Sequence, residues 1–163
     1  MNPAKLGNLT PEMASALGGL AYGLYFLSTG SLEQPRGMLV SWVSQVSGDP
    51  PLIQVAVRHN RGMLPEIMAQ GEFALNLLPS GDRDLAAALG RPPQQRWDGI
   101  KFSEGPLGLP VLTQGPGAIG CRILDSSRPG DHELILVRPS GALWRGGPVL
   151  STAEFEHAYL GLS

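Results

Sequence analysis

Two arginines that close an apolar, strand-like run are the residues of this chain best suited to bind an anion. The segment Arg-His-Asn-Arg at residues 58–61 follows apolar residues at 53, 55 and 57, whose alternation predicts a core face. A guanidinium fork matches the oxygens of a phosphate, and the amides of a turn can supply further donors. Arg58, Asn60 and Arg61 therefore predict a phosphate clamp. From these residues alone, a surface hairpin with solvated arginines is the alternative.

The stretch before this run carries hydroxyl and amide side chains inside an apolar pattern. Strict alternation from residue 39 places Ser41, Gln45 and Ser47 on one face, and Trp42 and Val46 on the other. A row of hydroxyl and amide groups within an apolar strand suits a polar, planar ligand. We expect a hairpin over residues 37–61, turned at the Gly-Asp-Pro-Pro segment, whose two strands carry the polar row and the arginines.

A histidine stands at the start of another candidate strand, residues 132–137. His132 follows a Gly-Asp turn and shares a face with Leu134 and Leu136, which we interpret as the apolar face of that strand. A histidine in this place can contact a ligand at the rim of a barrel. The competing interpretation is a structural histidine with a satisfied hydrogen bond, which is the more common role of a lone histidine.

Composition excludes several classes of protein. Charged residues make up 16% of the 163 residues and the formal net charge is −2, so there is no electrostatic footprint for nucleic acid or an anionic membrane. The single cysteine, Cys121, rules out an intrachain disulfide, and no Cys/His cluster predicts a metal site. The longest apolar run, residues 17–27, is too short for a bilayer and lacks a signal-peptide pattern. We expect a single domain over residues 1–163, in a reducing cytoplasm.

Short strands must position these groups, because glycine and proline punctuate the chain densely. The 22 glycines and 15 prolines favour tight turns over long helices. Helix signals fall at residues 10–18, 64–70, 82–89 and 151–159, with Thr10 and Asp82 as predicted N-caps and a capping box opening the last. Phe155 and Tyr159 would dock that last helix. A strand at 22–29 is expected to extend the 37–61 hairpin into a meander.

The remaining segments predict further strands. These are expected at residues 73–78, 100–104, 111–113, 121–125 and 132–137, with a turn at Ser140-Gly141 leading into a last strand through Trp144. Residues 115–120 match the G-x-G-x-x-G pattern of dinucleotide-binding folds. We reject that match, because a strand follows where the pattern requires a helix N-terminus, and Pro116 occupies a spacer position. About eight short strands and three or four short helices indicate a mainly β domain of Greek-key or barrel type.

A collinear series of short segments carries a resemblance to a known family. The segments are Gly23-Leu24-Tyr25, Ser28-Thr29-Gly30, residues 37–47, Pro50-Pro51-Leu52, residues 55–58, residues 71–78, Lys101-Phe102, residues 108–112, Cys121-Arg122 and Gly130-Asp131-His132. Their order over about residues 20–137 resembles the flavin reductase-like domains, which are FMN-binding split β-barrels. The Ser-Trp-Val-Ser-Gln segment is similar to the flavin reductase modules fused to some flavodiiron proteins.

The resemblance implies a Greek-key split β-barrel with a few short flanking helices, assembled as a homodimer with FMN near the interface. FAD is the alternative flavin, and NADH or NADPH is the implied hydride donor. Carried over by position, it assigns flavin contacts to Val40, Ser41, Trp42, Gln45, Val46 and Ser47. It assigns phosphate binding to Arg58, Asn60 and Arg61, and a place beside the flavin or the nicotinamide to His132.

The leading hypothesis is therefore an NAD(P)H:flavin oxidoreductase, with a flavin-dependent acceptor protein as a candidate partner. The alternatives are a non-enzymatic FMN electron carrier of flavoredoxin type and a dimeric binding module without flavin. Two departures from the family bear on this choice. The chain has Gly62-Met63-Leu64-Pro65 where family members usually carry a hydroxyl residue, and residues 134–139 lack the family's glycine and acidic continuation.

Overall fold

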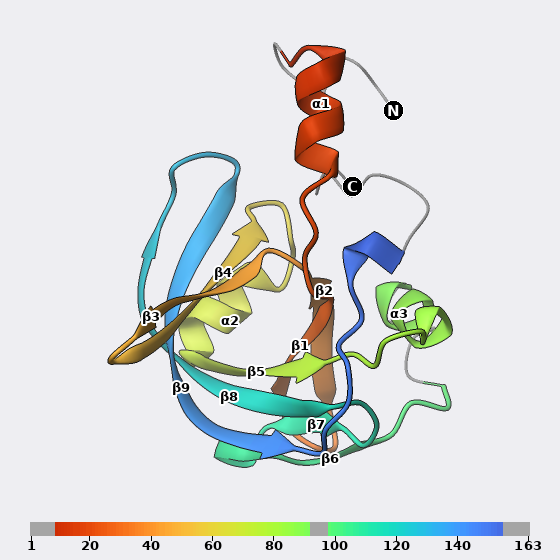
Figure 1. Cartoon of the computed structure of the whole chain (residues 1–163). Helices are drawn as coiled ribbons and strands as arrows, with labels where there is room; N and C mark the ends of the chain where they lie inside the picture. The colour runs from red at the N-terminus through yellow and green to blue at the C-terminus, as the bar shows by residue number, and fades with distance from the viewer. Residues whose placement is uncertain (1–8, 92–97, 155–163) are drawn as a thin grey trace.

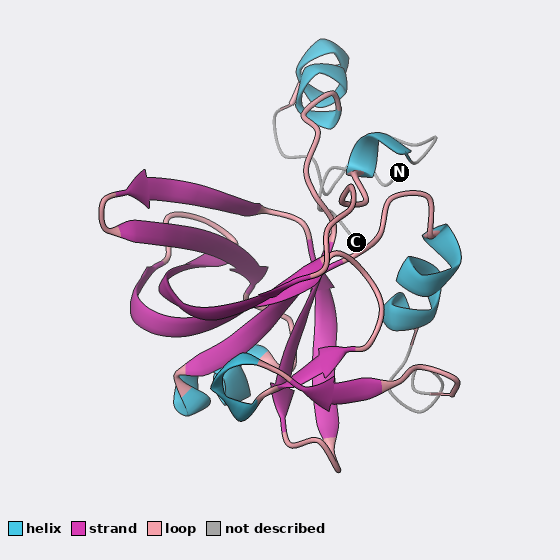
Figure 2. Cartoon of the chain, turned by 60° about the horizontal axis from the view of Figure 1, so that its bottom comes forward, coloured by secondary structure: helices cyan, strands magenta, loops and turns pink. Residues whose placement is uncertain are grey.

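A computed structural model describes residues 9–91 and 98–154 of the chain, which is organised around a large antiparallel sheet (Figures 1 and 2). Its seven strands run in the order β2-β1-β5-β8-β9-β4-β3, and β6 and β7 form a second, two-stranded sheet. The strands are β1 Tyr25–Gly30, β2 Pro35–Val40, β3 Val43–Gly48, β4 Pro51–Arg58, β5 Glu72–Leu77, β6 Phe102–Glu104, β7 Pro110–Leu112, β8 Gly117–Ser127 and β9 His132–Trp144. The expected mainly β architecture is confirmed.

The predicted meander is wrong, because the chain bends between β2 and β3. β2 pairs with β1 at one end of the sheet, whereas β3 pairs with β4 at the other end. Ser41 and Trp42 form the two-residue break. Val40 and Val43 lie an odd number of positions apart, yet both pack into the same core cluster. The strict alternation expected from residue 39 therefore does not continue past the break, and a second irregularity follows between Gln45 and Ser47.

The face of β9 also differs from the prediction. Glu133, Ile135 and Val137 are buried, whereas His132 and its same-face neighbours are half-buried. The expected apolar face is thus the outer one, and a charged residue takes a core-side position because Ser126 and Arg128 bind its carboxylate. Residues 140–141 make no turn. β9 runs through them to Trp144, and its pairing with β8 shifts register there.

The described part of the chain forms three short α-helices, which are α1 Pro11–Gly18, α2 Leu64–Gln70 and α3 Arg83–Gly90. The predicted caps are confirmed, since the side chains of Thr10 and Asp82 accept hydrogen bonds from the helix amides of Met13 and Leu85. Gly71 ends α2 in the left-handed conformation, with φ of 75°. α3 packs against β2, whereas α1 projects away from the sheet (Figure 1).

The C-terminal capping box is formed as far as the structure describes it. Glu154 accepts a hydrogen bond from the Ser151 amide at 2.9 Å, as the motif predicts. A one-turn 3-10 helix, η3 Thr152–Glu154, follows the cap, and another, η2 Pro106–Gly108, precedes β7. The helix expected beyond the cap, with Phe155 and Tyr159, lies outside the described residues.

The main core lies on the inner side of the sheet, between its strands and α2. It contains Val55, Phe73, Cys121, Ile135 and other fully buried side chains. Burial raises the pKa of the Cys121 thiol to about 12, so Cys121 acts as a small buried apolar side chain. β8 begins at Gly117, so the rejected glycine motif does lead into a strand.

Asn76 joins three strands through a buried hydrogen-bond network. Its side-chain amide donates to the Phe26 carbonyl and the Ser28 hydroxyl, both at 2.8 Å, and its side-chain oxygen accepts from the Leu112 amide at 2.8 Å. Ser28 in turn donates to the Pro110 carbonyl at 2.6 Å. These bonds satisfy polar groups that would be costly to bury alone, and they fix β7 against β1 and β5.

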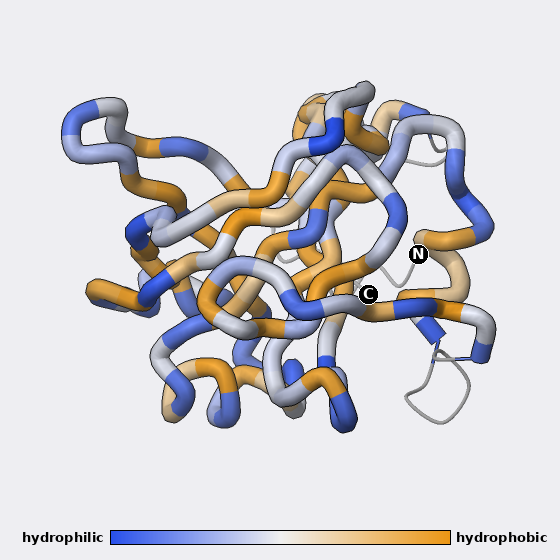
Figure 3. The backbone as a smooth tube through the Cα atoms, turned by 90° about the horizontal axis from the view of Figure 1, so that it is seen from below, coloured by the Kyte–Doolittle hydropathy of each residue, from blue (hydrophilic) through white to orange (hydrophobic). Residues whose placement is uncertain are grey.

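Hydropathy alternates along the folded chain, and the apolar residues do not gather in one long segment (Figure 3). Within the described ranges, no helix has the length and apolar character needed to span a membrane.

Candidate functional site

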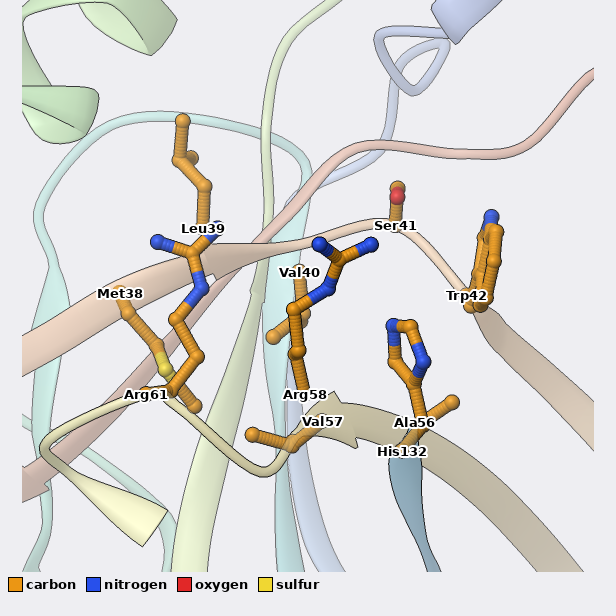
Figure 4. Close-up of a pocket in the computed structure, with 10 residues that line it drawn as sticks. All are labelled: Met38, Leu39, Val40, Ser41, Trp42, Ala56, Val57, Arg58, Arg61 and His132. Atoms are coloured by element: carbon orange, nitrogen blue, oxygen red, sulfur yellow. The ribbon is translucent and has the colours of Figure 1, made fainter. Parts of the chain in front are cut away.

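A shallow pocket lies where β4 ends and β9 begins. Register places Arg58 directly opposite His132, so the two candidate strands bring a guanidinium and an imidazole to the same edge. The pocket has a volume of about 30 Å³, and its lining comes from β2, the break after it, β4, the following turn and β9. The lining residues are Met38, Leu39, Val40, Ser41, Trp42, Ala56, Val57, Arg58, Arg61 and His132 (Figure 4).

Arg58 and Arg61 extend along the same side of this pocket, as Figure 4 shows. The amide of Arg61 donates to the Arg58 carbonyl at 3.0 Å, which closes the turn between them. Only 16% of the Arg58 side chain is exposed, so its charge acts in a partly desolvated place where an anion is bound more strongly than at an open surface. Asn60 is exposed and does not line the pocket.

His132 lies between Arg58 and Trp42 (Figure 4). Its ring centroid is 4.6 Å from that of Trp42, with 31° between the planes, and 12% of its side chain is exposed. The neighbouring indole holds the plane of the imidazole. Trp42 also contacts Tyr22, whose ring centroid lies 6.1 Å away. The break after β2 therefore builds an aromatic wall beside the basic side chains.

Asp131 holds two of these pocket residues. Its carboxylate lies 2.6 Å from Nδ1 of His132 and 3.7 Å from the Arg58 guanidinium. The hydrogen bond with His132, followed by the charges of His132 and Arg58, lowers the pKa of Asp131 below its usual value. Asp131 is therefore ionised at neutral pH. The backbone carbonyl of Asp131 also accepts from the His59 amide at 3.1 Å, which ties the 58–61 turn to the start of β9.

A second carboxylate supports the turn from the core side of β9. Glu133, whose side chain is 3% exposed, accepts hydrogen bonds from Ser126 and Arg128, and it lies 3.8 Å from Nε2 of His59. The hydrogen bond from Ser126 is the largest cause of the lowered pKa of Glu133, ahead of the contribution of Arg128. The turn that carries both pocket arginines is thus held by Asp131 on one side and Glu133 on the other.

The structure does not bring every expected contact to this pocket. Val40, Ser41, Trp42, Arg58, Arg61 and His132 line it, whereas Gln45, Val46, Ser47 and Asn60 do not. Gln45 lines a different, mainly apolar hollow of about 300 Å³ on the core side of β4, together with Tyr25, Leu75 and Ile119. Val46 is 49% exposed. The break at residues 41–42 and the irregularity after Gln45 explain why the expected polar row is not continuous.

One buried donor beside the pocket has no partner. Nε1 of Trp42 is the buried side-chain nitrogen or oxygen for which the described residues provide no hydrogen-bond partner. Leaving such a donor unpaired costs about 1–3 kcal/mol. The atom is closed to solvent, so a ligand in the pocket reaches it only if the side chains around it move. The two arginines, the histidine and the aromatic wall around the pocket fit a phosphorylated, planar heterocycle, whose phosphate and ring need these two kinds of partner.

The pocket does not have the composition of a metal centre. Within residues 9–91 and 98–154, no group of three or more His, Cys, Asp or Glu side chains could hold a metal ion.

Sequence reasoning found the arginines, His132 and the residues around Ser41, but it missed the contribution of Asp131 and Ala56. Asp131 belongs to the Gly-Asp-His segment, so its place beside a candidate histidine was the available signal. Ala56 had none, because its place in the pocket follows from the hydrogen bond of its amide to the Trp42 carbonyl at 2.9 Å, which joins β4 to the break after β2. The stacking of Trp42 on His132 joins residues 90 positions apart and needs the tertiary fold.

The fold of this chain is similar to that of solved flavin reductases. The fold matches that of the flavin reductase PheA2 in its native state, with a TM-score of 0.77 over 88% of this chain and 93% of that one, at 23% identity. The fold is thus the mainly β one found in flavin reductases, as expected.

The family follows from the sequence match. Residues 17–147 match the flavin reductase like domain, and the chain belongs to this family. The flavin reductase (NADH) of Kitasatospora aureofaciens is 30% identical over 82% of this chain and 70% of its own length. Diflavin flavoprotein A 1 of Synechocystis sp. is 30% identical over 80% of this chain, which spans 24% of that protein's length. The chain therefore corresponds to about a quarter of such a diflavin flavoprotein.

Proposed function

We propose that this protein is an NAD(P)H-dependent flavin reductase that binds FMN at the pocket between β4 and β9. The observation that carries the proposal is the convergence of Arg58, Arg61 and His132 on one pocket that Trp42 also lines. Membership in the flavin reductase like domain family supports the same chemistry. A relative of which this chain covers 70% is named flavin reductase (NADH).

The phosphate of FMN is the group that the two arginines fit. Their guanidinium groups donate in a planar fork, and the closed turn between them fixes their spacing. Ser41, buried to 4% exposure at the break after β2, adds a hydroxyl on the opposite wall. FMN ends in a single phosphate that is open to such contacts, whereas in FAD the corresponding phosphate is joined to a second phosphate and an adenosine. A clamp for a terminal phosphate therefore favours FMN over FAD.

Bound FMN supplies the ring that accepts and donates the reducing equivalents. The residues of the chain hold and orient the cofactor. The Trp42 indole forms an aromatic wall beside the cofactor, Arg58 and Arg61 neutralise the phosphate, and His132 presents Nε2 because Asp131 occupies Nδ1. None of these groups has to act as a nucleophile.

We further propose that two chains assemble around the cofactor. Ligand pockets that enclose a drug-sized molecule measure roughly 300–1,000 Å³, whereas this one measures about 30 Å³. It can hold the phosphate end, but it leaves a three-ring system exposed unless a second chain covers it. α1 supplies an apolar surface nearby, since Met13 and Leu17 are 51% and 39% exposed and the chain runs from α1 to Tyr22 beside Trp42. A homodimer with FMN near its interface satisfies both features.

The experiment is a spectral and kinetic assay of the purified protein. FMN and FAD are titrated separately, and the oxidation of NADH and of NADPH is followed with each flavin. We expect FMN to bind and one of the two nucleotides to be oxidised in its presence. A flavin-bound protein that neither nucleotide reduces, but that a partner protein reduces, would be an electron carrier. A colourless protein that binds neither flavin would overturn the proposal.

A further inference from the structure

Asp131 contacts two pocket residues without lining the pocket itself. Its side chain is 70% exposed, whereas those of His132 and Arg58 are 12% and 16% exposed. One carboxylate oxygen lies 2.6 Å from Nδ1 of His132, and the other lies 3.7 Å from the Arg58 guanidinium. Asp131 therefore contacts these two side chains from the solvent side and leaves their pocket side open to a ligand.

The contact with His132 decides which ring nitrogen a ligand meets. A carboxylate accepts hydrogen bonds and donates none, so Nδ1 must carry a proton. Nε2 is then the nitrogen left for the pocket, as an acceptor in the neutral ring and as a donor in the imidazolium. The Trp42 indole at 4.6 Å holds the plane of the ring, and the contact with Asp131 selects which nitrogen faces the pocket.

We propose that Asp131 is a positioning residue that fixes the Nδ1–H form of His132 and the orientation of the Arg58 guanidinium, and so sets the groups that the pocket presents to flavin and nicotinamide. The inference rests on the proposed function for the identity of these ligands. The Asp131 carboxylate thus connects His132, beside the proposed flavin ring, to Arg58, beside the proposed phosphate.

The other charged groups around His132 do not substitute for this carboxylate. Arg58 and Arg61, from β4 and the turn after it, are cations that share the pocket with His132. Glu133 lies on the opposite face of β9, where Ser126, Arg128 and His59 surround it. Asp131 is thus the acidic group of the described residues that the structure pairs with His132.

The first test reads the tautomer directly and does not depend on activity. Two-bond proton–nitrogen NMR distinguishes Nδ1–H from Nε2–H, and a His132→Gln variant assigns the signal among the histidines of the chain. In the free protein we expect the Nδ1–H form. In Asp131→Ala we expect Nε2–H to become the main neutral form, and in Asp131→Glu we expect Nδ1–H to return. Persistence of the Nδ1–H form in Asp131→Ala would overturn the proposal for His132.

The second test compares FMN with riboflavin, which lacks the phosphate. Because the Asp131 side chain is exposed, its effect on Arg58 is screened, and we expect Asp131→Ala to lower the FMN-to-riboflavin affinity ratio about two- to fivefold. Asp84→Ala, at an exposed position on α3, should leave the ratio unchanged. An unchanged ratio in Asp131→Ala would overturn the proposal for Arg58.

Two further outcomes keep the proposals separate. If Asp131→Ala does not fold, Asp131→Asn removes the charge at nearly the same size, and it should lower the affinity ratio in the same direction. Failure of the unaltered protein to bind FMN would overturn the proposed function and, with it, the proposal for Arg58. The tautomer of His132 would still be decided on the free protein.

Discussion

At the scale of single residues, the two pocket arginines differ in their surroundings. Arg58 belongs to β4, is mostly buried and lies beside Asp131. Arg61 lies in the turn and is exposed as a whole residue, although its side chain lines the pocket. The burial of Arg58 should make its contact with a phosphate the stronger of the two, because less water screens it.

Replacing either arginine tests this difference. Arg58→Ala should weaken FMN binding by about 1.5–3 kcal/mol, the range for a hydrogen bond to a charged group, and Arg61→Ala should weaken it by about 1 kcal/mol or less. Riboflavin affinity should change little in both variants. Isothermal titration or fluorescence quenching measures these affinities. Arg122→Ala, on β8 and paired with Glu72 at the surface, is the matched control. Equal FMN affinity in all three variants would remove the arginines from the site.

Glu133 gives stability a defined dependence on pH. Folding lowers its pKa below the ordinary value of 4.5, so the folded protein favours the ionised form. The resulting stabilisation is fully present above that value and is lost as the pH falls through the lower pKa of the folded state. Glu133→Gln should therefore be less stable than the unaltered protein near neutral pH, and this difference should shrink in acid.

Urea unfolding of both proteins across this pH range measures the effect. Glu104→Gln, at an exposed position in β6, is the control and should follow the unaltered protein at every pH. A difference between the Glu133 variant and the unaltered protein that stays constant with pH would show that ionisation of Glu133 is not its cause.

At the scale of elements, the sequence predicted what local signals determine. The caps at Thr10 and Asp82, the helix over residues 64–70 and the core face of β4 depend on neighbours within a few positions, and all are as expected. Long-range pairing was not predictable in this way. Residues 37–47 read as one strand because their composition is uniform, but the sheet needs them at two different edges, so the chain bends at Ser41 and Trp42.

The same reasoning explains the error in β9. Alternation alone gives two candidate faces, and the face of His132, Leu134 and Leu136, which was expected to be the apolar one, is not the core side. Glu133 is tolerated on the core side because Ser126 and Arg128, both brought close by the β8–β9 pairing, satisfy its carboxylate. Which face of this strand is buried thus depends on residues outside it. For the pocket, this error placed His132 on the correct strand end but on the wrong side of the sheet.

Close packing of β2 against β1 makes one glycine indispensable. A Cβ at Gly37 would lie 2.1 Å from the Phe26 ring and 2.7 Å from the Leu27 carbonyl oxygen. Gly37→Ala should therefore destabilise the fold by about 1–3 kcal/mol. Gly48→Ala, with nothing within 4 Å of the added Cβ, should stay within about 0.5 kcal/mol of the unaltered protein. Urea midpoints compare the two. Similar losses in both variants would contradict the packing argument.

At the scale of the whole molecule, the outward position of α1 is the feature that a lone chain leaves unexplained. Its two large exposed apolar residues, Met13 and Leu17, are four positions apart and share one side of the helix. None of the residues of α1 is buried. A short helix with no buried face gains little stability from its own chain, which is consistent with the proposed dimer.

The dimer proposal predicts a change of mass. In Met13→Glu/Leu17→Glu, charges should replace the apolar contact and shift the assembly toward single chains, as light scattering after gel filtration measures. Ser15→Glu, on the other side of α1, should leave the mass unchanged. If the dimer forms equally well in the double variant, another surface joins the chains. If the unaltered protein is monomeric at every concentration, the proposed assembly is wrong.

The single thiol of the chain is a natural probe of how often the core opens. Cys121 is fully buried, and its pKa of about 12 leaves almost no thiolate, which is the form that reacts with disulfide reagents. The native protein should resist labelling, and each chain should take up one equivalent once it unfolds. The labelling rate at low denaturant then reports how often the centre of the sheet is exposed, without any engineered probe.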